Sequence, residues 1–121
     1  MALPREYRLS GKSEIEEIFK KGKYLNSELF SIKFLSTNTK FSRFAIIISL
    51  KVSKKSVLRN KIRRRVSEII RLNQSIIKPG YNIVLIVKSR AINKEYAGLK
   101  EALVKELSKI GIGVPNEIIT E

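Results

Sequence analysis

The chain of 121 residues contains 25 Lys and Arg but only 11 acidic residues, which gives a formal net charge of +14. Its length is typical of one domain, and its charge favours a polyanionic partner such as nucleic acid. Cys, His and Asp are absent, which excludes disulfides, thiolate or imidazole metal sites and Ser-His catalysis, and disfavours a two-metal nuclease.

The first predicted helix follows an opening segment, residues 3–9, that we expect to be extended. Ser13 and Glu16 have the spacing of a capping box at a helix N-terminus. Apolar residues then recur at helical spacing over 15–19. Together these features predict a helix over 13–22.

Two or three strands are predicted after this helix. Residues 28–36 alternate between apolar and polar side chains, which predicts a strand with one solvated face. Residues 44–50 are typical of a better-buried strand. A further short strand near 24–26, or a division of these two strands, is an open alternative.

The second half of the chain predicts a helix, a strand and a helix. Apolar residues at helical spacing indicate a helix from Ser56 to about Asn73. Residues 83–87 form an uninterrupted apolar strand, which we expect to be central. Asn93 can cap the last helix, and Gly111 can end it.

This order of elements predicts an α+β fold with one mixed sheet and its helices on one side. We expect one domain over residues 1–121, with a core over about 3–111 and a flexible tail over 112–121. The N-terminus does not resemble a signal peptide, and no apolar stretch is long enough to span a membrane. We therefore expect a cytoplasmic protein with no membrane partner.

Lys51–Arg71 is the segment that carries most of the functional information, because its nine basic residues accompany a single acid, Glu68. Like charges on one helix repel each other, so folding alone does not explain them. A polyphosphate partner does, because each neutralised phosphate releases a counterion. The alternatives are a merely solvated basic face and a helix that lies on anionic lipid, the latter disfavoured because the apolar face is needed for the core.

Residues 58–65 (LRNKIRRR), preceded by residues 51–57 (KVSKKSV), resemble the signature of the protein subunit of bacterial ribonuclease P. Residues 3–9, 14–22 and 81–91 are similar to that family's opening segment, first helix and last strand. The resemblance implies the element order α-β-β-β-α-β-α, in a sandwich like the second domain of ribosomal protein S5. It also implies a left-handed βαβ crossover, against the usual right-handed rule.

The resemblance further implies removal of the 5′ leader from precursor tRNA by a catalytic RNA subunit with its Mg²⁺. The protein would then hold no cofactor or metal, supply no catalytic residue, and bind this RNA as a monomer in a 1:1 complex. The implied RNA-binding residues are Lys51, Lys54, Lys55, Arg59, Asn60, Lys61, Arg63, Arg64 and Arg65. The implied leader-cleft residues are Phe19, Phe30, Lys33, Lys88 and Arg90.

Some assignments stay open in the sequence. Ile15 stands where the family often has an aromatic residue, and the lysine among residues 51–55 that faces RNA is not fixed. Phe19 and Phe30 each fit a core position as well as the leader cleft. If the face of the strand with Phe30 is core, Lys33 lies on the opposite surface. The alternative functions are a ribosomal or RNA-chaperone type of binding module and a stand-alone nuclease.

Overall fold

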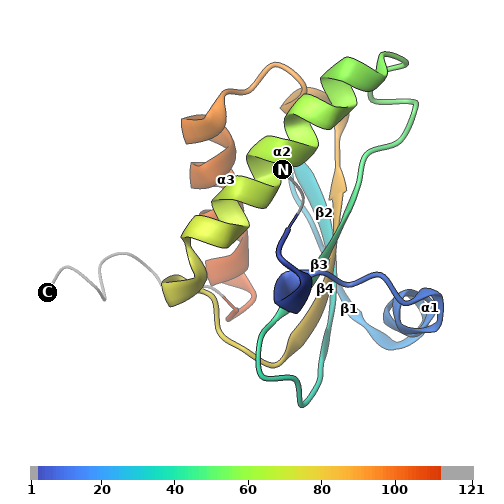
Figure 1. Ribbon diagram of the computed structural model, residues 1–121, viewed down its shortest axis with the longest axis vertical. Coiled ribbons are helices and arrows are strands. Elements are labelled where there is room, and N and C mark those ends of the chain that lie inside the picture. The colour runs from blue at the N-terminus through green and yellow to red at the C-terminus, as the bar shows by residue number, and fades with distance from the viewer. Residues whose placement is uncertain (1–2, 113–121) are drawn as a thin grey trace, which may run out of the picture.

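Residues 3–112 are described by the computed structural model, and they form a four-stranded mixed sheet with helices on both faces (Figure 1). The strands are β1 (Lys23–Asn26), β2 (Phe30–Ser36), β3 (Arg43–Ile47) and β4 (Tyr81–Val87). The α-helices are α1 (Lys12–Lys21), α2 (Ser56–Leu72) and α3 (Tyr96–Lys109). This architecture confirms the predicted α+β class, and β1 is the short strand that the sequence left open.

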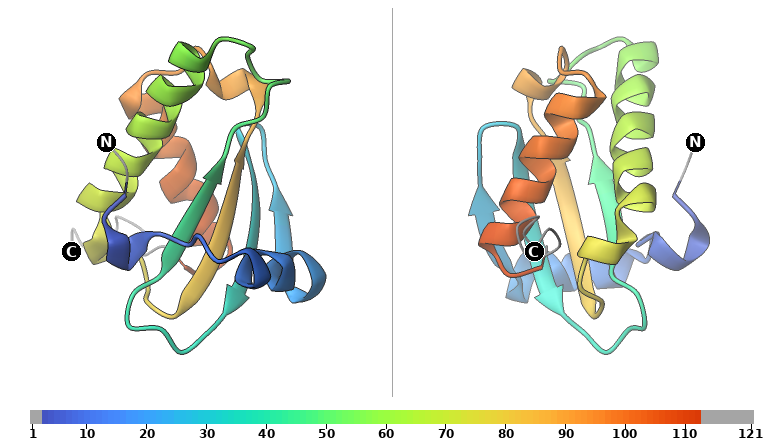
Figure 2. Two further views of the ribbon diagram at one scale, coloured as in Figure 1. Left: turned by 45° about the vertical axis from the view of Figure 1, so that its right-hand side comes forward. Right: turned by 90° about the vertical axis from the view of Figure 1, so that its left-hand side faces the viewer.

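The sheet order is β1-β2-β4-β3. β1 pairs antiparallel with β2, β2 antiparallel with β4, and β3 parallel with β4. β4 is therefore an interior strand, as predicted from its apolar run. In the right panel of Figure 2 the helices face the viewer, and the chain passes from green β3 through α2 to gold β4 on its left, with both strands pointing upward. This crossover is left-handed, which is the rare hand.

The main core lies between the sheet and the pair α2 and α3. On β2, Phe30, Ile32 and Phe34 are buried and belong to this core. The helices contribute apolar residues at helical spacing, which are Ile62, Val66, Ile69 and Ile70 from α2 and Leu99, Leu103 and Leu107 from α3. Burial of one such side chain stabilises the fold by about 1.5–3 kcal/mol. The apolar face of α2 is therefore used for folding, which leaves its other face free.

A second, smaller core lies on the opposite face of the sheet. Ile18 of α1 is fully buried there, against Leu9 and Val84. The prediction that all helices lie on one side is therefore wrong for α1. The physical reason is that β4 is apolar on both faces, since Ile83 and Leu85 belong to the main core while Val84 faces away from it.

The helix starts differ from their predictions. α1 begins at Lys12 after Gly11, and no side chain caps it, so the predicted capping box of Ser13 is wrong. α3 begins at Tyr96 rather than after Asn93. The Lys94 N–H donates to the Ala91 carbonyl (3.1 Å), so Asn93 lies in a turn before α3.

The two ends of the described chain are also more structured than predicted. Residues Arg5–Tyr7 form a 3-10 turn, so the opening segment is extended only in part. Gly111 follows α3 with a positive φ of 82°. Ile112 is fully buried, and its N–H donates to the Leu107 carbonyl (2.9 Å). Ile112 therefore packs with the core, and the remainder of the predicted tail, residues 113–121, lies outside the described residues.

Gly22 lies where the end of α1 meets the backbone of β2. A Cβ there would lie 2.5 Å from the Ile18 carbonyl oxygen and 2.8 Å from the Phe34 carbonyl oxygen. Because both are main-chain atoms, we expect Gly22→Ala to lower the free energy of unfolding by about 1–3 kcal/mol, measured by urea denaturation. Gly98→Ala in α3 is the control, since its Cβ would meet only the Lys94 side chain at 3.7 Å. Gly98→Ala should raise the free energy of unfolding, because Ala favours a helix more than Gly does. If both variants changed the free energy of unfolding equally, the close approach of Gly22 to the Ile18 and Phe34 carbonyls would be contradicted.

Candidate nucleic-acid interface

The loop that precedes α2 is held in a defined shape by its own polar groups. The Val52 N–H donates to the Ser49 carbonyl (3.1 Å), and the Lys51 N–H donates to the Ser49 hydroxyl (3.2 Å). Arg59 donates from Nη1 to the Ser53 carbonyl (2.8 Å), which ties the loop to the start of α2. Val52 also packs against the core. The loop therefore presents its lysines from a braced backbone.

The N-terminus of α2 lacks the groups that usually neutralise a helix start. Its N-cap, Lys55, makes no side-chain capping hydrogen bond, and the first turn contains no acidic residue. The first backbone N–H groups of a helix have no intrahelical acceptor, and the helix dipole adds positive potential there. Exposed Lys54 and Lys55 add to this potential. This end of α2 is therefore suited to an anion such as phosphate.

The nine residues predicted to bind RNA fall into two structural groups. Three arginines are partly buried and donate to backbone carbonyls: Arg59 to Ser53 (2.8 Å), Arg63 to Ile46 (2.6 Å) and Arg65 to Lys94 (2.8 Å). The other six are exposed, and their side chains make no hydrogen bond or ion pair within residues 3–112; they are Lys51, Lys54, Lys55, Asn60, Lys61 and Arg64. The exposed group is available to a partner, whereas the arginines also fix α2 in place.

The exposed part of the second sheet face carries two aromatic rings around one cation. The Lys33 ammonium lies 5.2 Å from the ring centroid of Phe19 and 5.0 Å from that of Tyr24. Phe19 is 43% exposed and Tyr24 is 55% exposed. The rings come from α1 and β1, and Tyr24 is the cross-strand partner of Lys33 on β2. Exposed rings beside a cation are the combination that binds unpaired nucleotides.

The other predicted leader-cleft residues do not join this group. Phe30 is completely buried in the main core, so its assignment to the cleft is wrong. Lys88 donates from Nζ to the Ser27 carbonyl (2.6 Å), and Arg90 pairs with Glu28 (2.6 Å). Both therefore contact the turn between β1 and β2.

Tyr24 is the residue that sequence reasoning missed. Its strand has only four residues, too few for an alternation pattern to assign a face. Its position opposite Lys33 depends on the pairing register of β1 and β2. The only signal in the sequence was an aromatic residue within the short strand left open near residues 24–26.

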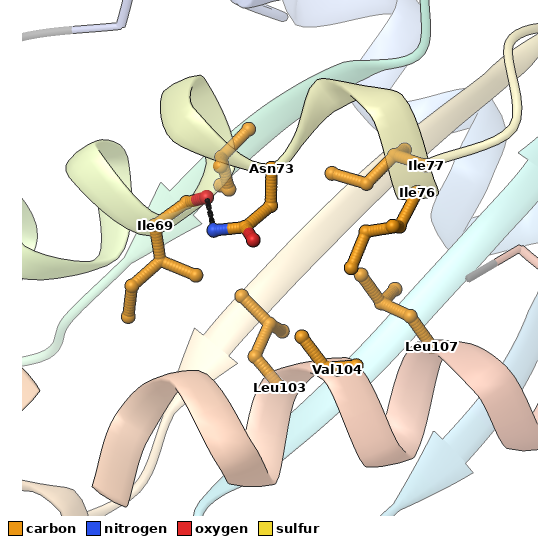
Figure 3. Close-up of a pocket in the computed structure, with 8 residues that line it drawn as sticks. Ile69, Asn73, Ile76, Ile77, Leu103, Val104 and Leu107 are labelled. Atoms are coloured by element: carbon orange, nitrogen blue, oxygen red, sulfur yellow. Dashed lines mark hydrogen bonds between the residues drawn. The ribbon is translucent and has the colours of Figure 1, made fainter. Parts of the chain in front are cut away.

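A further hollow of the described chain is small and apolar. Between the end of α2 and α3 lies an apolar gap of about 10 Å³, lined by Ile69, Asn73, Ile76, Ile77, Leu103, Val104 and Leu107 (Figure 3). The Asn73 amide donates to the Ile69 carbonyl (2.7 Å), so this amide group already has a hydrogen-bond partner within the protein. A gap of this size is at the limit for one water molecule. Residues 3–112 contain no group of three His, Cys, Asp or Glu placed to hold a metal ion, and none of their helices is long and apolar enough to cross a membrane.

Comparison with known proteins gives consistent likenesses in sequence and in structure. The sequence pattern of the family described as Ribonuclease P matches residues 3–111. The "Ribonuclease P protein component" of a Synechocystis strain is 33% identical over 113 residues, which are 93% of this chain and 91% of that protein. The protein of the same name from a Picosynechococcus strain is 34% identical over 110 residues, 91% of each chain.

Solved structures agree with these sequence likenesses. The ribonuclease P protein from Thermotoga maritima superposes with a TM-score of 0.76 and 31% identity, over 84% of this chain and 96% of that one. The protein from Staphylococcus aureus gives a TM-score of 0.78 and 25% identity, over 88% of this chain and 97% of that one.

The left-handed α+β fold and the cationic side of α2 are those of a small RNA-binding protein that works within a ribonucleoprotein. The family match over nearly all of the described residues makes the assignment specific. The chain belongs to the ribonuclease P protein family, the protein components of bacterial ribonuclease P.

Proposed function

We propose that this chain binds the catalytic RNA of ribonuclease P through α2 and the loop before it, and the 5′ leader of precursor tRNA through the exposed sheet face. The complex contains one protein and one RNA, acts in the cytoplasm, and releases tRNA with a mature 5′ end. The RNA carries out the cleavage, and the protein positions the substrate.

The observation that carries this proposal is the exposed cationic surface of α2. Three of the six exposed residues, Lys51, Lys54 and Lys55, precede the N-terminus of α2, which has no side-chain cap, and the other three lie along the helix. Nothing in the described fold neutralises them, while Arg71, further along the helix, already pairs with Glu68 (2.7 Å). Phosphates would neutralise these side chains and release counterions. Asn60 adds an amide that can address a phosphate, a 2′-hydroxyl or a base edge.

The leader contact is supported by the cluster of Phe19, Tyr24 and Lys33. Each ring can stack on one base of a single strand, and the ammonium between them can neutralise the phosphate that joins two nucleotides. Stacking and phosphate neutralisation do not depend on which base is present, so these contacts favour an unpaired strand rather than a particular sequence.

Assignment of the cleavage to the RNA is supported by the side chains of the protein. The chain has no His, Cys or Asp, and its described Glu residues do not gather into a metal-binding group. Mg²⁺ held by the RNA would supply the charge stabilisation that phosphate-ester hydrolysis needs. The protein would contribute affinity and orientation.

Reconstitution tests this proposal. The protein and its cognate ribonuclease P RNA, combined at low Mg²⁺, should cleave a precursor tRNA at its mature 5′ end, and neither component alone should do so. The measurement is the initial rate of leader release, with the RNA alone at the same Mg²⁺ concentration as control. Binding to mixed RNA or ribosomes without such cleavage would favour a general RNA-binding module, and cleavage by the protein alone would show a nuclease.

A further inference from the structure

Leu50 and Val57 are large apolar side chains that the fold leaves in solvent. Leu50 is 65% exposed in the turn closed by Ser49 and Val52, and Val57 is 72% exposed on the first turn of α2. Neither belongs to a core cluster of the described residues. Most of each side chain therefore takes no part in the packing of this fold. Leu50 lies in the braced loop and Val57 on the first turn of α2, on either side of the exposed Lys51, Lys54 and Lys55 in the sequence.

The surroundings of these two side chains determine the kind of partner that fits. Lys51, Lys54 and Lys55 are exposed beside them, and the sequence contains no acidic residue between Glu28 and Glu68. A second copy of the same surface would be repelled. Lysines are sufficient to bind a phosphate. An apolar side chain adds binding free energy only where it packs against an apolar face of the partner. An unpaired nucleotide offers both, a phosphate and an uncovered base or sugar face.

We propose that Leu50 and Val57 pack against unpaired nucleotides of the RNA that α2 binds, while the neighbouring lysines neutralise the adjoining phosphates. This inference rests on the proposed function and adds a contact with base or sugar faces to the contact with phosphates. In a regular duplex the base faces are covered by stacking, so this contact discriminates folded RNA from a plain duplex. Because the loop is already ordered, little conformational entropy is lost on binding.

Binding measurements on the full-length protein test the inference, with the ribonuclease P RNA transcript of the same organism and a fully paired RNA duplex as probes. Leu50→Ser and Val57→Ser should each weaken binding to the transcript by about five- to tenfold, because apolar burial is lost. The slope of log K against log salt should not change, since no charge is removed. Binding to the duplex should stay as in the parent protein.

Leu72→Ser is the matched control, because Leu72 is 56% exposed at the far end of the same helix, away from the lysine loop. It should bind both probes like the parent protein. Val57→Thr, which keeps the side-chain shape, serves as a second variant if a serine variant melts at a lower temperature. The inference would be overturned by unchanged affinity for the transcript, or by an equal weakening of binding to the duplex. It would also be overturned if the variants lost binding to anionic phosphatidylglycerol vesicles but kept their affinity for RNA. The proposed function would survive each result, because its own test is leader cleavage by the parent protein.

Discussion

Replacement of Lys54, Lys61 and Arg64 by Ala in one variant should weaken binding of the ribonuclease P RNA by about a hundredfold near physiological salt. Each lost phosphate contact costs roughly fivefold at this ionic strength and lowers the slope of log K against log salt by about one. All three side chains are exposed and have no partner within residues 3–112. The melting temperature should therefore remain unchanged while a salt series of dissociation constants records the loss.

The control removes the same charge from another helix. Lys94, Lys100 and Lys105 lie in α3 or just before it and are also exposed. Their joint replacement by Ala should change the salt slope by less than about one unit, because only long-range attraction is reduced. If this control lost as much affinity as the α2 variant, the net charge rather than the surface of α2 would explain binding.

Phe30→Ala should lower the free energy of unfolding by about 3–5 kcal/mol, because it removes a fully buried ring from the main core. Such a loss is a large fraction of the stability of a small domain. Urea denaturation followed by circular dichroism measures it. If the variant instead kept its stability but lost leader binding, Phe30 would have to be assigned to the leader cleft.

Phe19→Ala is the matched substitution on the other face of the sheet. Phe19 is 43% exposed, so its loss should cost less than about 1 kcal/mol of stability. In the reconstituted complex it should weaken binding of a precursor tRNA with a single-stranded leader by about tenfold, and leave binding of leaderless tRNA unchanged. A cost in stability equal to that of Phe30→Ala would place Phe19 in the core instead.

The elements that the sequence predicted well are those with strong periodicity. α2 was expected from Ser56 to about Asn73 and runs over Ser56–Leu72. The alternation of β2 correctly separated buried Phe30 and Phe34 from Lys33. In both cases local spacing and burial agree, because a helix or strand next to a core must place its apolar residues on one side.

Features that depend on pairing between distant segments could not be predicted in this way. The contact of Arg63 with the Ile46 carbonyl and that of Lys88 with the Ser27 carbonyl join residues far apart in the chain. The register that places Tyr24 opposite Lys33 is of the same kind. The family resemblance implies only an RNA-binding role for Arg63, whereas its long side chain donates a hydrogen bond to the backbone of β3 at the edge of the sheet.

The position of α1 and α2 on opposite faces of the sheet has a consequence for assembly. The sheet separates the exposed face of α2 from the rings on the α1 side, so the two proposed contacts use different surfaces of the protein. The two proposed surfaces can therefore be occupied together, in either order. Since neither obstructs the other, losses of affinity on the two sides should multiply when combined, as expected for thermodynamically independent sites.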